Sequence, residues 1–389
     1  MRVVLFTDTL GDVNGVSRFI RNMDTQAHLT GKSLHVLTST RLTIPDRPTL
    51  INIPPRYAQP MPGYPNLELA WPDGVLLGRW CRWLRPDAIH ISTPGPVGVL
   101  GRRLARQLGI PLVATYHTDF PAYVNMLLDD RVLDWICTRV MKWFYRPFDL
   151  VLTRSGAYRA PVMALGLPED RVVTLRPGID TATFSPGPRD DALMSRLGCP
   201  SGSVRVLYAG RVSVEKNLPM LAAIWPGIAE RARSAGVPAT LVVVGDGPYL
   251  ADLRARLSTE HAVTLGFRHG AELLAIYRSC DLFAFPSMTD TLGQSVMEAQ
   301  ACALPALVGD VGGPSEVVEH DQTGLVLPAG NARAWSDALL SLILDTARRQ
   351  RLSTAAAQRM APRTIRASFE HWWSLHELAI ARRQHPTGN

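Results

Sequence analysis

Short, uninterrupted apolar runs recur along the chain, and most of them end in a polar or glycine-containing turn. Such runs are typical of strands that are buried on both faces of a parallel sheet. Helical stretches separate most of them, which favours an α/β fold with doubly wound parallel sheets. The strands that we expect are Val3–Phe6, Leu34–Leu37, Leu50–Ile53, Ala88–Ile91, Leu112–Ala114, Leu150–Leu152, Val204–Ala209, Ala239–Val244 and Leu282–Phe285.

The length of the chain bounds the number of domains. With 389 residues, 46% of them hydrophobic, the chain is long for one domain and can form the cores of two. A polar stretch rich in proline and glycine, Pro186–Asp191, has the composition of a linker. We therefore expect a domain boundary near residues 180–190. A final helix is expected over Ile365–Arg383.

The net charge of +7 is concentrated in the first half of the chain. Residues 1–180 carry 21 Lys and Arg against 15 Asp and Glu, whereas residues 181–389 carry 20 against 19. A basic first half predicts an anionic partner, such as a lipid headgroup surface or a phosphorylated acceptor. Nucleic acid is not expected, because the chain has no recognised nucleic-acid-binding module. Only three of the cations are Lys, so an arginine-rich compositional bias is an equal alternative.

Cysteine usage and the lengths of the apolar runs bear on the cellular compartment. The five cysteines, at positions 81, 137, 199, 280 and 302, have neither disulfide-framework nor metal-ligand spacing, which indicates buried thiols in a reducing compartment. The first apolar run is too short for a signal peptide, and no run is long enough to span a bilayer. We expect a cytoplasmic protein, with peripheral binding to the inner face of the membrane left open.

The stretch from Phe285 to Glu316 carries the strongest functional signal. An apolar strand runs into a polar turn, and a helix follows from about Gln294 to Cys302. The backbone N–H groups at such a helix start favour a bound phosphate. Asp290 precedes the helix and Glu298 lies on its second turn, where a carboxylate can accept hydrogen bonds from sugar hydroxyls. The alternative is an ordinary α/β unit in which Asp290 caps the helix and Glu298 is solvated.

A second polar turn follows the expected strand Val204–Ala209. The spacing Gly-Arg-x-x-x-x-Lys-Asn over residues 210–217 places Arg211 and Lys216 on either side of one strand-to-helix turn. Both cations can therefore converge on the same dianion, Arg as a fork for two oxygens and Lys as a compact charge. The alternative is a solvated turn.

Two further candidates follow strands in the first half of the chain. The loop after Val3–Phe6 leads through Asn14, Gly15 and Val16 into a helix that runs to about Leu29, and a glycine there can let the backbone approach a phosphate. His117 lies just after another expected strand, at the edge where open α/β sheets bind ligands. A structural role is the alternative for this histidine.

Other segments allow more than one interpretation. Arg131–Phe148 is an amphipathic basic helix that could lie on an anionic bilayer. We favour instead a helix that packs its apolar stripe on the sheet and has a charged outer face; for Arg79–Arg85 we leave both interpretations open. Pro54–Pro72 contains six prolines and predicts an irregular loop. The apolar stripe of the basic helix consists of Leu133, Ile136, Val140, Trp143 and Phe144.

The pattern over residues 290–316 resembles the sugar-donor site of glycosyltransferase family 4. An acid, seven residues and a Glu are followed by Ala-x-Ala-x-x-x-Pro and by a Gly-Gly-x-x-Glu turn. The first acid of this pattern is usually Glu, so Asp290 is one methylene shorter. The family's Gly-Gly-Val turn is matched by Asn14, Gly15 and Val16, and Asn14 is tolerable in place of the first glycine because Asn adopts a left-handed backbone more readily than most residues. The matching residues are Asp290, Glu298, Ala299, Ala301, Pro305, Gly312, Gly313 and Glu316.

This resemblance covers nearly the whole chain and implies the GT-B fold, in which two Rossmann-like domains face a central cleft. It implies an acceptor-side domain over residues 1–182 and a nucleotide-sugar-binding domain over residues 183–364. Residues 365–389 would form a helix that crosses back to the first domain. The family is retaining and independent of metal ions, so we expect no cofactor and no metal ligands.

The resemblance also implies roles for single residues. Arg211 and Lys216, together with backbone amides at Gly15 and Gly293, would stabilise the charge that develops on the leaving diphosphate. Val263–Arg268 would cradle the base, although Phe267 could instead be a core residue. The implied catalytic residues are His117, Arg211, Lys216 and Asp290. The implied nucleotide-sugar-binding residues are Asn14, Gly15, Val16, Arg211, Lys216, Phe267, Arg268, Asp290, Thr291, Leu292, Gly293, Gln294 and Glu298.

The resulting hypothesis is a retaining transferase that moves a hexose from a UDP- or GDP-linked sugar to a hydroxyl of a membrane lipid or glycolipid. A soluble small-molecule or saccharide acceptor is the alternative within the same class. A sugar-nucleotide epimerase and a non-catalytic sugar-nucleotide-binding protein are the alternatives from other classes. The base, the sugar, the linkage and the oligomeric state do not follow from the sequence.

Overall fold

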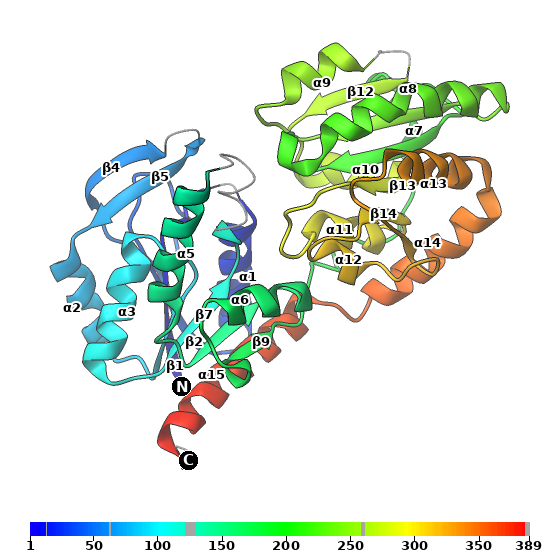
Figure 1. Cartoon of the computed structure of the whole chain (residues 1–389). Coiled ribbons are helices and arrows are strands. Elements are labelled where there is room, and N and C mark those ends of the chain that lie inside the picture. Colours follow the sequence, from blue (N-terminus) through cyan, green and yellow to red (C-terminus); the bar gives the residue numbers. More distant parts are fainter. Residues whose placement is uncertain (13, 62–63, 121–129, 258–260, 386–389) are drawn as a thin grey trace. The chain divides into compact units, whose positions relative to one another are not determined.

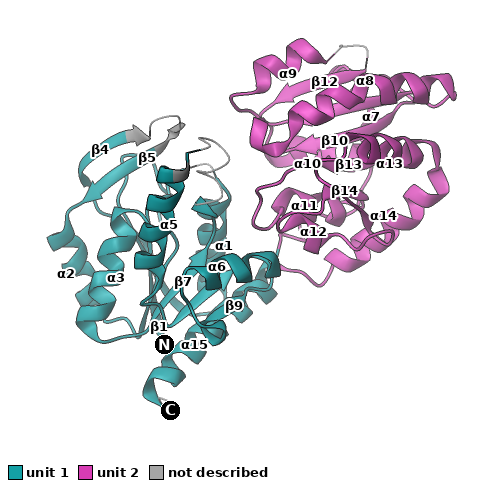
Figure 2. Cartoon of the chain, in the orientation of Figure 1, with its two compact units in different colours: residues 1–178, 365–389 teal, residues 179–364 magenta. Residues whose placement is uncertain are grey.

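The computed structural model describes residues 1–389 apart from residues 13, 62–63, 121–129, 258–260 and 386–389, and apart from the side chains of residues 60–61, 64–67 and 131. Its contacts divide the chain into two compact units (Figure 2). Unit 1 comprises residues 1–178 and 365–389, and unit 2 comprises residues 179–364. Helices and strands alternate in both units (Figure 1), and each unit has its own parallel sheet, so the predicted α/β class is confirmed.

Unit 1 is built on a seven-stranded sheet in the order β3-β2-β1-β6-β7-β8-β9, and every neighbouring pair in it is parallel. The central strands are buried on both faces, as their continuous apolar runs predicted. The edge strand β9 was not predicted, because its sequence Val-Val-Thr is too short to stand out. The strands are β1 (Arg2–Thr7), β2 (Ser33–Thr38), β3 (Leu50–Asn52), β6 (Ala88–Ile91), β7 (Leu112–Tyr116), β8 (Leu150–Thr153) and β9 (Val172–Thr174).

Helices cover both faces of this sheet. On one face, α1 (Gly15–Leu29) and α15 (Ile365–Gln384) share an apolar core with the strands. On the other face, α2 (Gly74–Leu84), α3 (Pro96–Leu108) and α5 (Arg131–Tyr145) share a second core. The last helix of the chain therefore packs beside the first one, within unit 1 (Figure 1).

The orientation of α5 differs from the one that we favoured. Its apolar stripe faces outward, and only one residue of the stripe, Phe144, is buried. The inward face is formed by Met141, Phe144 and Tyr145, which join the core with Phe148 just beyond the helix. The larger aromatic cluster therefore determines which face is buried. The expectation that the predicted stripe packs on the sheet is wrong, whereas Arg139 and Lys142 are exposed on the outer face as expected. The exposed residues are Val132, Leu133, Trp135, Ile136, Val140 and Trp143.

The proline-rich segment predicted as an irregular loop forms a two-stranded antiparallel sheet instead. Strands β4 (Pro55–Met61) and β5 (Tyr64–Pro72) pair with Pro55 opposite Pro72 and Tyr57 opposite Trp71. Each strand of such a ribbon has an unpaired edge, where a proline without an N–H group costs no ladder hydrogen bond. The six prolines are therefore compatible with a two-stranded ribbon, and the prediction of an irregular loop is wrong.

A buried chain of polar contacts joins α15 to the sheet of unit 1. His376 Nδ1 lies 2.8 Å from the Trp372 carbonyl oxygen, and His376 Nε2 lies 3.0 Å from His90 Nδ1. His90 Nε2 lies 3.0 Å from Thr115 Oγ1. Because a carbonyl only accepts, His376 carries its proton on Nδ1, so His90 donates from Nδ1 and accepts from Thr115. Burial lowers the pKa of His376 to about 4 and holds the pKa of His90 well below its usual range.

Unit 2 contains a six-stranded parallel sheet in the order β12-β11-β10-β13-β14-β15. Strands β10, β11 and β13 have the bounds that the apolar runs predicted. The strands are β10 (Val204–Ala209), β11 (Ala239–Val244), β12 (Ala262–Gly266), β13 (Leu282–Phe285), β14 (Ala306–Gly309) and β15 (Gly324–Leu327). The helices are α7 (Asp191–Arg196), α8 (Leu218–Ser234), α9 (Leu250–Arg256), α10 (Gly270–Ser279), α11 (Gln294–Ala301), α12 (Pro314–Val317), α13 (Ala332–Leu344) and α14 (Thr346–Met360).

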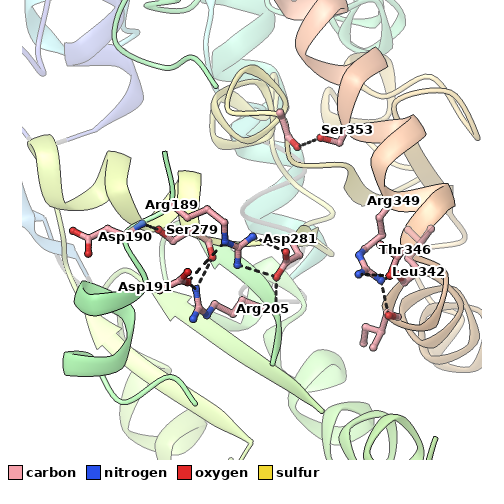
Figure 3. A network of polar contacts seen from close by, with 12 residues as sticks. Arg189, Asp190, Asp191, Arg205, Ser279, Asp281, Leu342, Thr346, Arg349 and Ser353 are labelled. Carbon is pink, nitrogen blue, oxygen red and sulfur yellow. Dashed lines mark hydrogen bonds and ion pairs between the residues drawn. The ribbon is translucent and has the colours of Figure 1, made fainter. Parts of the chain in front are cut away.

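The stretch expected to be a linker is bound to the sheet of unit 2. Arg189 Nη1 lies 2.7 Å from Asp281 Oδ1, and Asp281 also accepts a hydrogen bond from the backbone N–H of Arg205 (Figure 3). The buried Arg205 guanidinium in turn donates to Asp191 Oδ1 at 2.6 Å. This network holds Pro186–Asp191 against the strands β10 and β13.

Candidate functional site

The two polar turns singled out in the second half of the chain lie on neighbouring strands of unit 2. Strand β10 pairs with β11 on one side and with β13 on the other, so the order of the strands reverses between β10 and β13. Open α/β sheets bind ligands beyond the carboxyl ends of strands at such a switch point. The turns after β10 and β13 therefore meet at the part of the sheet where a ligand site is expected.

Lys216 and Asp290 are in contact at this switch point. Lys216 ends a short helical turn after β10, and its Nζ lies 2.8 Å from Asp290 Oδ2 and 3.5 Å from Thr289 Oγ1. Ser287 Oγ donates a further hydrogen bond to Asp290 Oδ2. The side chains of Lys216 and Asp290 are 15% and 26% exposed, so the pair is shielded from bulk water but remains accessible to a ligand.

The start of α11 depends on glycine. Gly293 is its N-cap and has a φ of 76°, in the left-handed region, and a Cβ there would lie 2.9 Å from Pro314 Cγ. In the part of the chain that the structure describes, no side chain caps this helix. Asp290 bonds Lys216 instead, so the capping alternative is wrong. The amides at the start of α11 favour an anion.

Glu298 lies on α11, but it is not solvated. Glu298 is only 3% exposed, and its carboxylate accepts a hydrogen bond from Tyr277 Oη of α10 at 3.3 Å. The alternative of a solvated Glu298 is therefore wrong. A buried carboxylate requires hydrogen-bond donors, and Tyr277 supplies one of them. Its role toward ribose remains a prediction.

The other residues around the two turns differ in exposure. Arg211 is exposed after β10, where its carbonyl oxygen accepts a hydrogen bond from Tyr208 Oη at 2.6 Å. At the start of α11, Thr291 and Gln294 are half-buried, whereas Leu292 belongs to the core of unit 2. Arg211 is thus accessible to a ligand, and Leu292 anchors the turn.

An exposed aromatic ring follows the strand β12. Phe267 is 56% exposed, so the alternative of a core residue is wrong. Its neighbour Arg268 forms an ion pair with Glu272, with Nε at 3.1 Å from Oε1. An exposed ring at the carboxyl edge of the sheet offers a flat apolar surface for a base.

In unit 1, the turn after β1 leads to the start of α1. Asn14 caps this helix, because its Oδ1 accepts a hydrogen bond from Ser17 N at 2.8 Å. Its φ of −147° is extended, so tolerance of a left-handed backbone is not the reason for Asn here, and capping explains the residue instead. A Cβ on the exposed Gly15 would meet nothing within 4 Å, which leaves space beside this helix start. Val16 is half-buried against the core.

His117 follows β7 as predicted and lies near Arg154, which the sequence motifs did not single out. The ring centroids of His117 and Phe19 are 5.1 Å apart, and the Arg154 guanidinium carbon lies 4.4 Å from the Phe19 centroid. Burial, and then the charge of Arg154, holds the pKa of His117 well below its usual range. The neutral ring can therefore exchange a hydrogen bond with a hydroxyl at pH 7.

Arg154 and Asp12 are further candidates at the carboxyl edge of the unit 1 sheet. Both are nearly buried, and among the described residues Arg154 Nη1 and Asp12 Oδ2 have no hydrogen-bond partner. Burial lowers the pKa of Arg154 to about 10. Burial, with the charges of Glu68 and Asp8, raises the pKa of Asp12 to about 6. Buried polar atoms of this kind are candidates for ligand contacts. Arg154 directly follows β8, a position that could have signalled it.

Comparisons with known proteins match both halves of the chain. Residues 13–183 match the family model described as Glycosyltransferase Family 4, and residues 190–359 match the one described as Glycosyl transferases group 1. The GDP-mannose-dependent alpha-mannosyltransferase of Mycobacterium tuberculosis is 31% identical over 98% of this chain and 98% of that protein. The D-inositol 3-phosphate glycosyltransferase of Rhodococcus erythropolis is 32% identical over 72% of this chain and 64% of that protein.

A third relative is the alpha-monoglucosyldiacylglycerol synthase of Streptococcus pneumoniae, with 26% identity over 85% of this chain and 78% of that protein. Among solved structures, HepE of Anabaena in complex with UDP has a TM-score of 0.76 at 18% identity and covers 97% of this chain and 100% of that one. Sucrose-phosphate synthase of Thermosynechococcus elongatus has the same TM-score at 20% identity, over 98% and 100% of the two chains. The chain therefore belongs to glycosyltransferase family 4, has the GT-B fold, and is a hexosyltransferase that depends on a nucleotide sugar.

Proposed function

We propose that this protein transfers a hexose from a UDP- or GDP-linked sugar to a hydroxyl of a membrane lipid or glycolipid, with retention at the anomeric carbon and without a metal ion. The contact between Lys216 and Asp290 at the switch point of unit 2 carries the proposal for the donor. The name of the streptococcal relative, a monoglucosyldiacylglycerol synthase, supports a lipid acceptor.

The proposed donor lies along the carboxyl edge of the unit 2 sheet. Its diphosphate would be bound by Arg211, Lys216 and the amides at the start of α11. The Lys216 ammonium has three N–H groups, and Asp290 and Thr289 engage at most two of them, so one can reach a diphosphate oxygen. Within the described parts of the chain, the side-chain donors to Asp290, Lys216 and Ser287, both bond Oδ2, so Oδ1 is left for a sugar hydroxyl.

The nucleoside would extend along the same edge. Phe267 would stack on the base with its exposed ring, and Arg268 would lie beside it. Glu298 would accept hydrogen bonds from the ribose diol, for which its carboxylate must become accessible from the buried position beside Tyr277. Gly15 and His117 belong to unit 1, and their implied contacts, the first with the diphosphate and the second with the transferred sugar, stay predictions.

Departure of the diphosphate is the step that needs stabilisation. The bond from the anomeric carbon to the diphosphate oxygen breaks, the bond to the acceptor oxygen forms on the same face, and the acceptor proton passes to a diphosphate oxygen. Negative charge grows on the diphosphate during this step, so a positive group fixed beside it lowers the barrier. Asp290 holds the Lys216 ammonium in place before the reaction, which limits the cost of reorganisation.

A soluble phosphorylated acceptor is the second candidate. The buried Arg154, whose Nη1 has no hydrogen-bond partner among the described residues, would suit an anionic group at the edge of unit 1. One relative is named as a D-inositol 3-phosphate glycosyltransferase. Arg154→Gln should then weaken binding of the acceptor and leave the affinity for the donor unchanged.

The experiment that tests the proposal begins with the donor. Thermal shifts with UDP- and GDP-linked hexoses identify the sugar nucleotide that stabilises the protein. Transfer from that donor is then measured with diacylglycerol in vesicles and, in parallel, with soluble polyol phosphates. Nuclear magnetic resonance of the product gives the anomeric configuration, which retention requires to match the donor.

Other results would contradict the proposal. Stabilisation by none of the sugar nucleotides would exclude the proposed donor. Nucleotide release with an epimerised sugar and no acceptor would indicate an epimerase. Donor binding without turnover on any acceptor would indicate a binding protein, and an inverted product would exclude retention.

A further inference from the structure

One helical layer of unit 1 is strongly basic. Helices α2, α3 and α5, which cover the same face of the sheet, together carry eight Lys and Arg and one acid, Asp134. Helices α1 and α15 on the opposite face together carry five Lys and Arg and three Asp and Glu. A uniform arginine-rich composition would not place the surplus on one face. The location of the charge therefore favours an anionic partner for this layer.

The same layer exposes large apolar side chains. On α5, Val132, Trp135 and Trp143 are 64%, 59% and 55% exposed, and on α2 Trp83 is 71% exposed. Leaving several such residues of one helix in water is unfavourable, and exposed apolar groups that gather in this way mark interaction sites. We call this surface the α2–α5 face. It consists of Trp83, Val132, Leu133, Trp135, Ile136, Val140 and Trp143.

Cations border the exposed tryptophans. The Arg139 guanidinium carbon lies 4.9 Å from the centre of the Trp135 ring, and that of Arg102 lies 3.9 Å from the centre of the Trp143 ring. Lys142 is exposed as well. At a membrane surface, tryptophan rings lie at the level of the headgroups, and arginine and lysine contact the lipid phosphates. The exposed tryptophans of α5, with cations beside them, have the composition of such a membrane-surface contact.

We propose that the α2–α5 face docks on an anionic lipid bilayer. Its apolar side chains would enter the boundary between headgroups and acyl chains, and the cations of α2, α3 and α5 would contact anionic headgroups. None of the helices within the described ranges is long and apolar enough to cross a membrane, so we expect peripheral contact. A second copy of the chain fits less well, because a symmetric contact would bring two basic layers together.

This inference concerns the lipid acceptor of the proposed function, yet it can be tested without any transfer. The full chain is sedimented with phosphatidylcholine vesicles that contain or lack phosphatidylglycerol. We expect binding to the anionic vesicles that weakens with added salt. Ile136→Ser with Trp143→Ser should lower the partition coefficient at least about tenfold because apolar area is lost. Arg139→Gln with Lys142→Gln should also lower it at least about tenfold.

Matched controls separate the α2–α5 face from general surface properties. Leu29→Ser with Leu344→Ser removes exposed leucines of α1 and α13, and Arg231→Gln with Arg333→Gln removes two exposed cations of unit 2. Both controls should bind vesicles like the original chain. Circular dichroism and binding of the sugar nucleotide verify that each variant is folded, so a loss of vesicle binding does not reflect a failure of the donor site.

Three results would overturn the inference. The original chain could fail to bind anionic vesicles, or the face variants could bind as well as their controls. Light scattering could show a dimer that Ile136→Ser with Trp143→Ser converts to a monomer, which would make the face an interface between copies.

Discussion

Lys216 Nζ lies 2.8 Å from Asp290 Oδ2, so that a cation from the turn after β10 and a carboxylate from the turn after β13 form an ion pair. The pair joins two neighbouring strands at the switch point of the unit 2 sheet. It satisfies part of the hydrogen-bonding capacity of each group and leaves both partly accessible. We expect this pair to be the part of the site on which turnover depends most.

Lys216→Ala should lower kcat at least about a hundredfold, by analogy with the loss of one donor to a developing oxyanion. The charge on the diphosphate grows mainly in the transition state, so the dissociation constant of the donor should change much less. Steady-state kinetics and calorimetry measure the two quantities. Lys32→Ala, which removes an exposed lysine of unit 1, is the control. A rate near that of the original chain would remove Lys216 from the mechanism.

Asp290→Asn should also lower kcat, because the amide no longer attracts the Lys216 ammonium. Since the two side chains are in contact, the double variant Lys216→Ala with Asp290→Asn should lose less than the product of the two single effects. Kinetics of the four proteins in this cycle measure the coupling. Independent, multiplicative losses would show that the contact plays no part in turnover.

Glu298→Gln should weaken binding of the nucleoside diphosphate about tenfold or more, because a charge-assisted hydrogen bond to the ribose is lost. The amide oxygen can still accept the hydrogen bond from Tyr277, so the buried environment is largely kept. Calorimetry with the ribonucleotide and its 2′,3′-dideoxy analogue tests the assignment. The variant should bind the analogue as the original chain does. An equal loss for both ligands would contradict the contact with the ribose diol.

EDTA should not inhibit transfer, because Lys216, Arg211 and the start of α11 would supply the positive charge that a metal ion supplies in other enzymes. Among the described residues, no three His, Cys, Asp or Glu side chains gather as a metal site. Initial rates of transfer with EDTA and with added Mg²⁺ or Mn²⁺ measure how far transfer depends on a divalent metal ion. Inhibition by EDTA that a divalent ion reverses would exclude this mechanism.

The contribution of His376 and His90 to the stability of the protein should fall as the pH decreases from 6.5 to about 4. Unfolded histidines bind protons near pH 6.5, whereas burial lowers the pKa of His376 to about 4 and that of His90 further still. The unfolded state therefore binds more protons in this range, and the stabilisation is complete only above about pH 6.5. The lowered pKa of His376 changes the free energy of unfolding by on the order of 3 kcal/mol across this range.

Denaturant unfolding of the original chain and of His376→Gln between pH 4 and 7 measures this contribution. Burial raises the pKa values of Asp8 and Asp12 to about 6, so their contribution to stability rises as the pH falls in the same range, opposite to that of the histidines. The quantity to compare is therefore the difference in free energy of unfolding between the original chain and His376→Gln, and this difference should shrink as the pH falls. A difference that is independent of pH would show that His376 does not titrate as expected.

Some features of the molecule follow from local sequence. Buried parallel strands need continuous apolar runs, so β10, β11 and β13 could be located to the residue. The turns with Arg211, Lys216 and Asp290 could be recognised by their spacing, because short-range geometry determines where a strand ends and a helix begins. These local patterns also predicted the α/β class, and they carry the resemblance to the family.

Other features depend on partners that are distant in the sequence. Periodicity grouped the apolar residues of α5, but competition with Met141, Phe144 and Tyr145 for the core decided that this stripe faces outward. The burial of Glu298 depends on Tyr277, and the tautomer of His90 depends on His376 at the other end of the chain. Local propensity was thus enough to place strands and turns, whereas packing between distant segments determined which side chains are buried, charged or exposed.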